Sequence, residues 1–462
     1  MKENKVSRRT FLKTSAVAAG AVGAIGTTGG LLTSCTGGGR GGQDVIRPLR
    51  EPGTYYIPKL QDLAPDGREL RAGVIGCGGR GRGATNNFLD AANNVTITAL
   101  GDPNQANLDR LAGILEERGI IIPPERRFTG LDAYRQVIDS GVDVIIDCVP
   151  PAFRPEHFRY AVENNVHCFL EKPLCVDAVG YRTVMAAARQ AQARRLTVIT
   201  GTQRHHQRSY VAAFQQIMNG VIGEITGGVV YWNQGQLWSR TRQPGWSDLE
   251  AMIRDWVNWR WLSGDHIVEQ HHHNIDVFTW FSGLRPVSAV GNGSRHRRPT
   301  GDQYDNFSID FTMENGIHLH SMSRQINGTA GHIAEFIQGT RGSWSSGHQG
   351  RDQVIRDLEG NEIWRWDDAA ARETYTQHNP YVLEHVDLID SIRTNRGVEQ
   401  ATETALSNMA GIMGREAAYT GQVVGWDEMT ASPQNLMPAD LCLTGRMDMS
   451  IVIPVPGAPV TT

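Results

Sequence analysis

A glycine-rich turn between two apolar segments constrains this chain more than any other feature. The short apolar segment Ala72–Ile75 leads directly into the motif Gly76-Cys-Gly78-Gly79-Arg80-Gly81. A stretch suited to a helix follows at Ala84–Ala92, and a second apolar segment, Val95–Leu100, runs toward Asp102. A strand, a tight glycine turn, a helix and a second strand in this order are typical of a unit that binds a dinucleotide.

Each position of the turn has a physical task in binding a dinucleotide. Gly76 permits the tight turn, Gly78 lets the backbone approach a pyrophosphate, and Gly81 lets the helix pack on the strand. The helix N-terminus adds N–H donors and the positive end of its dipole. Asp102 lies just after the second apolar segment, at a position where a carboxylate can accept hydrogen bonds from the ribose hydroxyls. A carboxylate there repels a 2′-phosphate, so NAD is predicted rather than NADP. The predicted cofactor-binding residues are Gly76, Gly78, Gly79, Arg80, Gly81, Asp102, Pro150, Glu171 and Lys172.

Strand and helix candidates alternate in the first half of the chain. The strand candidates are Ala72–Ile75, Val95–Leu100, Val142–Cys148, His167–Leu170 and Thr197–Thr200. The helix candidates between them include Gln105–Arg118, Leu131–Ser140, Pro155–Asn164 and Asp177–Ala193. This alternation predicts an α/β fold of the Rossmann type, a doubly wound parallel sheet with its ligand crevice beyond the carboxyl ends of the strands.

The pattern changes after Gly201. Extended runs separated by turn residues dominate, at Ile225–Trp232, Pro286–Gly291, Phe307–Met313, Ile317–Arg324 and Glu335–Gly339. They predict a second, α+β domain with an open, mainly antiparallel β-sheet. Helices are expected at Tyr210–Asn219, Tyr381–Thr394 and Thr402–Tyr419.

The first residues resemble an export signal. Ser7-Arg8-Arg9-Thr10-Phe11-Leu12-Lys13 is a twin-arginine motif, and a weakly apolar stretch leads to Leu32-Thr33-Ser34-Cys35, which resembles a bacterial lipobox. We expect lipidation at Cys35, which makes the protein a periplasmic lipoprotein held at the membrane only by its anchor. The alternative is a soluble exported protein cleaved at another small residue.

These patterns give five predicted regions. A signal peptide with lipobox (1–35) and a flexible tether (36–68) precede the NAD-binding Rossmann domain (69–201). A substrate and oligomerisation domain (202–430) and a C-terminal surface extension (431–462) complete the chain.

Charge and cysteine content narrow the class of protein. The formal net charge is −4, and residues 1–34 carry five basic and one acidic side chain, so removing them makes the chain more acidic. An acidic chain argues against nucleic acid as a partner. Without Cys35 an odd number of cysteines remains, with no disulfide framework or C-x-x-C zinc pattern, so buried thiols are expected.

A lysine follows the fifth predicted strand, in Phe169-Leu170-Glu171-Lys172-Pro173. At the carboxyl end of a parallel strand, the Lys172 ammonium can exchange a proton with a carbinol oxygen during hydride transfer, and Glu171 can orient it. The alternative is a solvated lysine before a turn.

Together these segments resemble the Gfo/Idh/MocA oxidoreductases of bacteria. The resemblance rests on the glycine motif, Gly101-Asp102-Pro103, Glu171-Lys172-Pro173, Gly201-Thr-Gln-Arg204, His273-Asn-Ile-Asp276, His385-Val-Asp-Leu-Ile and Ala417-Ala-Tyr-Thr-Gly421. It implies a Rossmann domain followed by an open-faced sheet that often mediates homo-oligomerisation, and sugars, polyols or their derivatives as substrates. It also implies that Lys172 assists proton transfer.

The family's second pattern, D-x-x-x-H-x-x-D, corresponds here to Glu269-Gln-His271-His272-His273-Asn-Ile-Asp276, with glutamate in the first position. Spacings of four and three predict that Glu269, His273 and Asp276 share one helical face. We interpret His273 as an acid/base and Glu269 as its partner or a second proton acceptor. A metal site formed by His266, Glu269 and His273 is an alternative, as is a purely structural role.

Further substrate contacts are predicted after the last Rossmann strand. Arg204, His205 and Tyr210 can reach substrate oxygens, together with Asp276; a hydrogen-bonded domain hinge is the alternative. Seven tryptophans between Trp232 and Trp280 suit either a carbohydrate pocket or core packing.

Three functions are compatible with these residues. The first is NAD-dependent oxidation or reduction of a sugar hydroxyl or keto group. The second is redox-neutral glycoside cleavage, in which transient oxidation at C3 acidifies the neighbouring C–H; an exported protein that keeps its cofactor bound suits such a cycle. The third is a non-catalytic, sugar-binding lipoprotein with a relic Rossmann fold.

Overall fold

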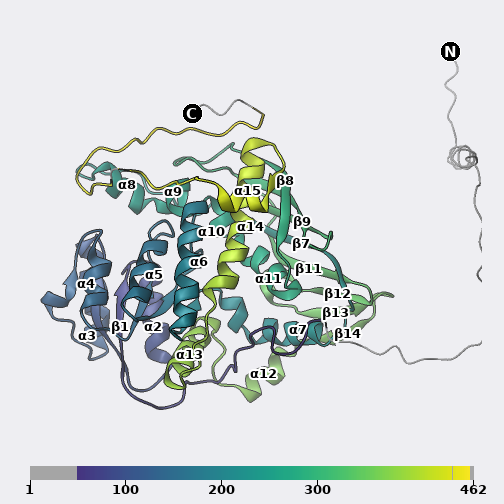
Figure 1. The fold of residues 1–462 in the computed structure, drawn as a ribbon, viewed down its shortest axis with the longest axis horizontal. Helices are drawn as coiled ribbons and strands as arrows, with labels where there is room; N and C mark the ends of the chain where they lie inside the picture. Colours follow the sequence, from purple (N-terminus) through teal and green to yellow (C-terminus); the bar gives the residue numbers. More distant parts are fainter. Residues whose placement is uncertain (1–48, 440, 458–462) are drawn as a thin grey trace, which may run out of the picture. The chain divides into compact units, whose positions relative to one another are not determined.

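The predicted parallel sheet is present, with its strands in the order β3-β2-β1-β4-β5-β6 (Figure 1). This computed structural model describes residues 49–439 and 441–457. The twin-arginine motif, Cys35 and residues 36–48 of the predicted tether therefore lie outside the described residues. The strands are all parallel and cover β1 (Leu70–Ile75), β2 (Val95–Gly101), β3 (Arg127–Phe128), β4 (Val144–Asp147), β5 (His167–Leu170) and β6 (Val198–Thr200).

Helices cover both faces of this sheet. One face packs on α4 (Ala133–Asp139), α5 (Arg154–Glu163) and α6 (Ala178–Ala193). The other face packs on α2 (Gly79–Asp90), α3 (Gln105–Glu117) and α13 (Pro380–Arg393). Polar caps start some of them, since the Asn104 side chain accepts from the backbone of α3 and Asp177 accepts from that of α6. A helix from late in the chain, α13, thus completes the first sheet.

The second sheet has nine strands in the order β14-β13-β12-β11-β7-β10-β9-β8-β15. All neighbouring strands are antiparallel except β7 and β10, which confirms the mainly antiparallel prediction. The strands are β7 (Ile225–Gln234), β8 (Pro286–Ser294), β9 (Asn306–Met313), β10 (His318–Gln325), β11 (His332–Gly339), β12 (Gly342–Ser345), β13 (Val354–Asp357), β14 (Glu362–Arg365) and β15 (Val424–Gly425).

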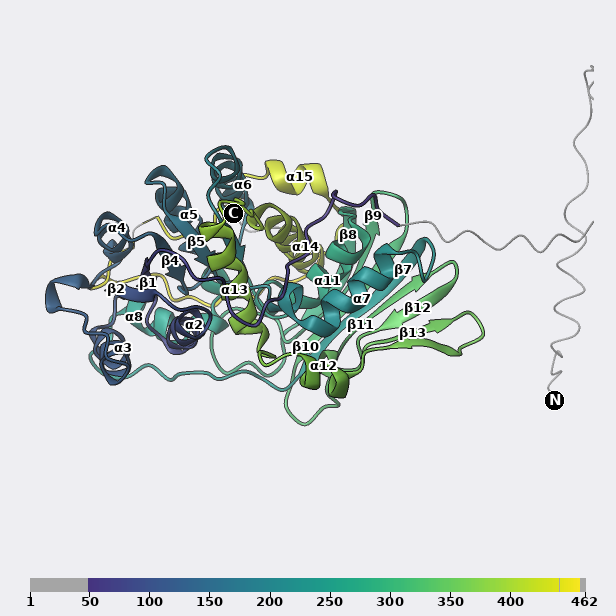
Figure 2. The ribbon, with the colours of Figure 1, turned by 90° about the horizontal axis from the view of Figure 1, so that it is seen from below.

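Helices pack on one face of the second sheet (Figure 2). Tyr231, Met322 and Phe336, whose side chains point to the other face, are partly exposed. The packed face contacts α7 (Arg208–Met218), α11 (His272–Ser282) and α14 (Ala401–Thr420). The remaining helices are α8 (Asp248–Arg254), α9 (Arg260–Ser263), α10 (His266–Glu269), α12 (Asp368–Thr374) and α15 (Trp426–Ala431). Short 3₁₀ turns occur at Pro124–Arg126, Gln203–His206, Trp256–Asn258 and His348–Gly350.

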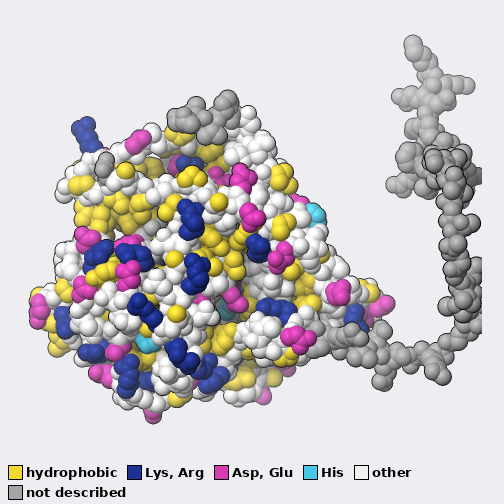
Figure 3. Space-filling view, viewed as in Figure 1, with side chains coloured by type: hydrophobic (Ala, Val, Ile, Leu, Met, Phe, Trp, Pro, Cys, Tyr) yellow, Lys and Arg dark blue, Asp and Glu magenta, His cyan; other side chains and the backbone are white. Residues whose placement is uncertain are grey.

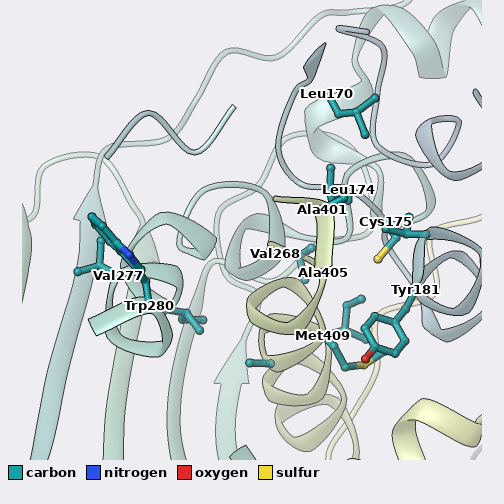
Figure 4. Close-up of a cluster of buried hydrophobic side chains, with 14 of the residues drawn as sticks. Leu170, Leu174, Cys175, Tyr181, Val268, Val277, Trp280, Ala401, Ala405 and Met409 are labelled. Carbon is teal, nitrogen blue, oxygen red and sulfur yellow. The ribbon is translucent and has the colours of Figure 1, made fainter. Parts of the chain in front are cut away.

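One apolar core joins the two sheets. Leu170 at the end of β5, Val268 of α10 and Val277 of α11 belong to the same buried cluster as Met409 of α14. In Figure 4, Val268 and Met409 lie at α14, while Leu170 lies above them and Val277 lies beside Trp280 on α11. Residues 49–439 and 441–457 accordingly belong to one compact unit. The seam between the sheets is therefore a firm support for side chains that face it.

In residues 49–439 and 441–457, we find no helix long and apolar enough to cross a membrane.

Candidate functional site

The glycine motif forms the tight turn between β1 and α2. Gly76 has a φ of +87°, and a Cβ there would lie 2.8 Å from the carbonyl carbon of Cys148. A Cβ on Gly81 would lie 1.8 Å from the Gly76 carbonyl oxygen, so α2 can pack this closely only with glycine. Gly78 and Gly79 face open space, where a dinucleotide backbone can approach.

Asp102 is positioned at the end of β2 by backbone donors. Its carboxylate accepts hydrogen bonds from the N–H of Cys77 (2.8 Å) and of Asn104 (2.7 Å), and the Asn107 amide contacts both oxygens at 3.2 Å. Burial raises the pKa of Asp102. The backbone bonds hold the carboxylate in place, whereas the Asn107 contacts are ones that ribose hydroxyls can replace. These residues fit the adenosine ribose of NAD.

A cavity beside Asp102 fits the adenine ring. Its lining comes from the ends of β1, β2 and β4, from the loop before α4 and from one residue of α8. The lining is mostly apolar and includes Ile75, Pro103, Leu131, Val149, Pro150, Phe153 and Ile253. The predicted residue Pro150 therefore lies with Asp102 at the same edge of the sheet.

Arg80 of the glycine motif is held between two carboxylates. Its guanidinium donates to Glu171 and, at 3.2 Å, to Glu384 Oε1, and it lies 4.6 Å from the Tyr381 ring. Burial raises the pKa of the Glu384 carboxyl well above its usual range. Sequence reasoning missed Glu384, because nothing in the motif indicates that α13 returns to the first sheet.

Lys172 meets Glu269 across the seam. The Lys172 Nζ lies 3.0 Å from Glu269 Oε1 and 2.7 Å from the Glu269 carbonyl oxygen. Both side chains are largely buried, with 11% and 7% exposed. An ammonium has three N–H donors, so one is left with no partner among the described residues. The structure thus joins Lys172 to Glu269, which was predicted as the partner of His273 or a second proton acceptor. The Glu171 carboxylate, which was predicted to orient Lys172, pairs with Arg80 instead.

The three consecutive histidines have different surroundings. Nε2 of His271 lies 2.7 Å from Ser321 Oγ, and Nε2 of His272 lies 3.0 Å from Ser407 Oγ. His273 instead stacks on Trp232, with ring centroids 5.5 Å apart, and its ring nitrogens have no hydrogen bond within the described part of the chain. His273 is the histidine whose ring remains available to a ligand.

Burial keeps these imidazoles neutral. It lowers the pKa of His272 to about 4 and that of His271 and His273 well below the usual range. The positive charge of Lys172 adds to the effect at His273. A neutral imidazole beside an ammonium can accept a proton from a substrate hydroxyl.

The predicted common helical face is wrong for Glu269, whereas His273 and Asp276 do lie three residues apart in α11. The α10 helix ends at Glu269 and α11 begins at His272, because the N–H of His271 bonds back to the His266 carbonyl and closes a wider turn. Asp276 consequently lies away from Lys172. It accepts hydrogen bonds from His205 Nε2 (2.7 Å) and Ser407 (2.8 Å).

His205 and Asp276 line a separate cavity of about 290 Å³. His205 stacks on Trp280 there, with centroids 4.0 Å apart, and neither Lys172 nor His273 is part of the lining. Their role in substrate binding remains a prediction.

Arg204 and Tyr210 belong to a buried cluster with Glu335 and Asn274, which we call the arginine cluster. Arg204 donates to Glu335, whose carboxylate also accepts from the Tyr210 hydroxyl (2.9 Å) and the Asn274 amide (2.6 Å). Burial raises the pKa of Tyr210. Glu335 lies inside β11, where it is the last of three consecutive buried residues, and nothing in the sequence of this strand indicated a charged partner.

The metal alternative has no support in the described residues. His266 Nδ1 lies 3.1 Å from Asp265 and 3.2 Å from Arg298, and its Nε2 lies 3.1 Å from Ser323 Oγ. No group of three or more His, Cys, Asp or Glu that could hold a metal ion occurs in residues 49–439 and 441–457.

Comparisons with known proteins agree with this geometry. Residues 70–200 match the family model described as "Oxidoreductase family, NAD-binding Rossmann fold" (GFO_IDH_MocA). An inositol 2-dehydrogenase of Paracoccus denitrificans is 30% identical over 158 residues, which are 34% of this chain and 43% of that protein. The chain thus spans less than half the length of this relative.

Two longer matches extend beyond the first sheet. A glycosyl hydrolase family 109 protein of Streptomyces coelicolor is 22% identical over 377 residues, covering 81% of this chain and 70% of that protein. The crystal structure of an aldose-aldose oxidoreductase from Caulobacter crescentus superposes with a TM-score of 0.61 and 17% identity, covering 78% of this chain and all of that one.

The fold and the site define a protein that binds NAD through a Rossmann domain. Residues 70–200 match the NAD-binding Rossmann fold of the Gfo/Idh/MocA oxidoreductase family.

Proposed function

We propose that this protein is a NAD-dependent oxidoreductase that oxidises or reduces a CH–OH group of a sugar, polyol or glycoside. The observation that carries the proposal is the Lys172 ammonium, fixed by Glu269 beside the neutral ring of His273. The inositol 2-dehydrogenase relative supports a polyol or sugar as substrate.

The side chains at the seam have separate tasks in this reaction. NAD, when bound, exchanges a hydride with the substrate carbon. The His273 imidazole accepts the hydroxyl proton as the alcohol is oxidised, and the free N–H of Lys172 stabilises the negative charge that develops on the oxygen. Glu269 fixes the ammonium, since it accepts two of its three N–H donors. Reduction of a ketone uses the same groups in reverse.

The proposal is tested by identifying the nucleotide first and the substrate second. Purified protein is denatured, the released nicotinamide nucleotide is identified, and sugars, polyols and glycosides are then screened by mass spectrometry. We expect NAD(H) in the supernatant and conversion of at least one carbohydrate. Absence of the nucleotide, with no binding on titration, would favour a non-catalytic sugar-binding protein.

Redox-neutral glycoside cleavage is a second candidate, supported by the long match to the glycosyl hydrolase family 109 protein. Oxidation at C3 acidifies the C2–H bond; loss of that proton expels the aglycone as its alcohol. Water then adds to the unsaturated ketone, and return of the hydride to C3 restores the hydroxyl. Reaction in deuterated water places deuterium at C2 of the product. Release of a 3-keto sugar with the aglycone still attached contradicts this route.

We further propose that the protein is exported by the twin-arginine route and anchored through Cys35. The support is the arrangement of Arg8, Arg9 and the Leu32–Cys35 segment. Palmitate labelling in cells is expected to be lost in Cys35→Ala. Globomycin, which blocks removal of a lipoprotein signal peptide, is expected to leave the longer precursor uncleaved. Unchanged labelling in Cys35→Ala contradicts the anchor.

Self-association through the open face of the second sheet is also proposed. The partly exposed Tyr231, Met322 and Phe336 on that face support it. Light scattering is expected to give the mass of more than one copy, and a monomer at micromolar concentration contradicts it.

A further inference from the structure

The cavity beside Asp102 has a wall from outside the Rossmann strands. Ile253 of α8 lines it opposite residues such as Pro103 and Val149. The α8 helix lies in the long connection between β7 and α11, yet it reaches back to the first sheet (Figure 1). The neighbouring Arg254 carries a positive charge that favours the ionised form of Asp102, against the opposing effect of burial.

An apolar cluster holds α8 in this position. Leu249 and Met252 of α8 are buried against Trp259 and Trp261, and residues near the cavity join them. The C-terminal segment supplies the outer layer of this cluster with Leu436, Met437, Leu441, Leu443, Met447 and Met449. Figure 3 shows hydrophobic side chains gathered in the region of α8 and α9, over which this segment runs in Figure 1.

Two hydrogen bonds from backbone N–H groups to aspartate side chains hold the C-terminal segment near its two ends. The Met447 N–H donates to Asp248 Oδ2 at 2.9 Å, at the start of α8. The Leu436 N–H donates to Asp177 Oδ2 at 2.7 Å, at the start of α6. The segment therefore links α8 to the Rossmann domain rather than lying loosely on it.

We propose that α8, fastened by residues 434–439 and 441–449, closes the adenosine end of the NAD site and retains the dinucleotide between turnovers. Ile253 covers the apolar cavity that fits the adenine ring, so release requires α8 to move away. That movement exposes the apolar cluster to water and is therefore costly. The proposal goes beyond the reaction, because it concerns retention of the cofactor whichever substrate is used.

The C-terminal segment offers a matched pair of variants. Leu443 is half-buried in the cluster, whereas the next residue, Thr444, is exposed. Each variant, Leu443→Asp and Thr444→Asp, is made in the full chain and loaded with NADH, and the loss of nicotinamide fluorescence is followed after a chase with excess NAD. We expect release to be about 10-fold faster in Leu443→Asp and unchanged in Thr444→Asp, with similar thermal melting. Equal release rates in the two variants overturn the proposal.

A second pair of variants tests the adenosine end itself and serves if Leu443→Asp does not fold. In nucleotide-free protein, Ile253→Ala is expected to weaken binding of AMP about 10-fold and to leave binding of nicotinamide mononucleotide unchanged, as measured by calorimetry. The control is Ile121→Ala, since Ile121 is 75% exposed. AMP affinity equal to that of the unaltered protein overturns the proposal. Neither outcome depends on the reaction catalysed.

Discussion

Two buried ion pairs connect the ends of the Rossmann strands to the second half of the chain. They differ in the hydrogen bonds that neighbouring side chains make to each pair. Lys172 follows β5 and pairs with Glu269, while Arg204 follows β6 and pairs with Glu335. Glu335 is fully buried and also accepts from Tyr210 and Asn274, so the arginine cluster is satisfied internally. Lys172 keeps a donor without a partner among the described residues. Position after a parallel strand therefore does not by itself identify a ligand contact.

The largest expected effect is on chemistry at the lysine. Lys172→Ala removes the N–H that stabilises the charge on the substrate oxygen and the cation next to His273, so we expect the rate of hydride transfer to fall about 10²- to 10⁴-fold. The matched control is Lys59→Ala, because Lys59 is a half-exposed partner of Asp390. Single-turnover kinetics with bound NAD measure both variants. A rate within two-fold of the unaltered protein removes Lys172 from the mechanism.

A substitution in the arginine cluster is expected to lower the stability of the fold rather than the rate of the reaction. Arg204→Ala leaves the Glu335 carboxylate buried without its cation, so we expect the free energy of unfolding to fall by about 3–5 kcal/mol. Urea denaturation measures it, and KM is determined on the folded fraction. A raised KM with unchanged stability would instead make Arg204 a substrate-binding residue, and the contrast with Lys172 would disappear.

The adjacent residues His272 and His273 allow the same comparison, between an effect on stability and an effect on the rate, within one turn of helix. His273→Ala is expected to lower the rate about 10²-fold with little change in melting temperature, because its ring has no hydrogen bond to lose among the described residues. His272→Ala breaks the contact to Ser407, so about 1–3 kcal/mol of stability is lost while the rate per folded molecule is kept. Equal kinetic effects in both variants contradict this division.

The smallest effect is on the pH dependence of stability. Burial lowers the pKa of His272 and His167 to about 4, whereas an unfolded histidine titrates near 6.5. The unfolded state therefore binds more protons, and the stability that is complete above pH 6.5 is lost as the pH falls toward 4. Each such histidine contributes about 1.4 kcal/mol per pH unit in that window.

A buried carboxyl and one histidine oppose this trend: burial raises the pKa of Glu384, so its folded form binds a proton that its unfolded form has already released. Burial alone would lower the pKa of His205, but the Asp276 carboxylate outweighs this effect and the pKa is raised. The contribution of His205 to the stability of the fold is therefore present below pH 6.5 and is lost above it. The histidines with lowered pKa are more numerous, so we expect the urea midpoint to fall between pH 7 and pH 5. His272→Gln should flatten the curve; a midpoint that rises on acidification contradicts the argument.

Local patterns predicted the first sheet well because each of its requirements is local. A Cβ at Gly76 or Gly81 collides with neighbouring backbone, so the glycine spacing alone indicates the turn. Lys172 and Glu269 were each singled out from the sequence, by a strand end and by a family pattern, but their pairing was not predicted. The common helical face failed because the periodicity of side chains does not reveal a wider turn at His271.

Contacts between distant segments were not predictable. Glu384 reaches Arg80 only because α13 packs on the first sheet, and Glu335 meets Arg204 only because β11 lies beside β7. The clustered tryptophans fitted either a sugar pocket or a core. The structure uses Trp259 and Trp261 for packing and places Trp232 against His273.

By itself, the order of residues predicted the nucleotide-binding turn, the preference for NAD and the place of Lys172 at the end of a parallel strand. These features depend on steric and charge requirements within a few residues. Tertiary structure decided which histidine ring has no hydrogen bond among the described residues, which ion pair has a carboxylate that also accepts from a tyrosine and an asparagine, and that residues 436–439 and 441–449 pack with Ile253 of α8. Those outcomes depend on packing between segments hundreds of residues apart, which no local spacing encodes.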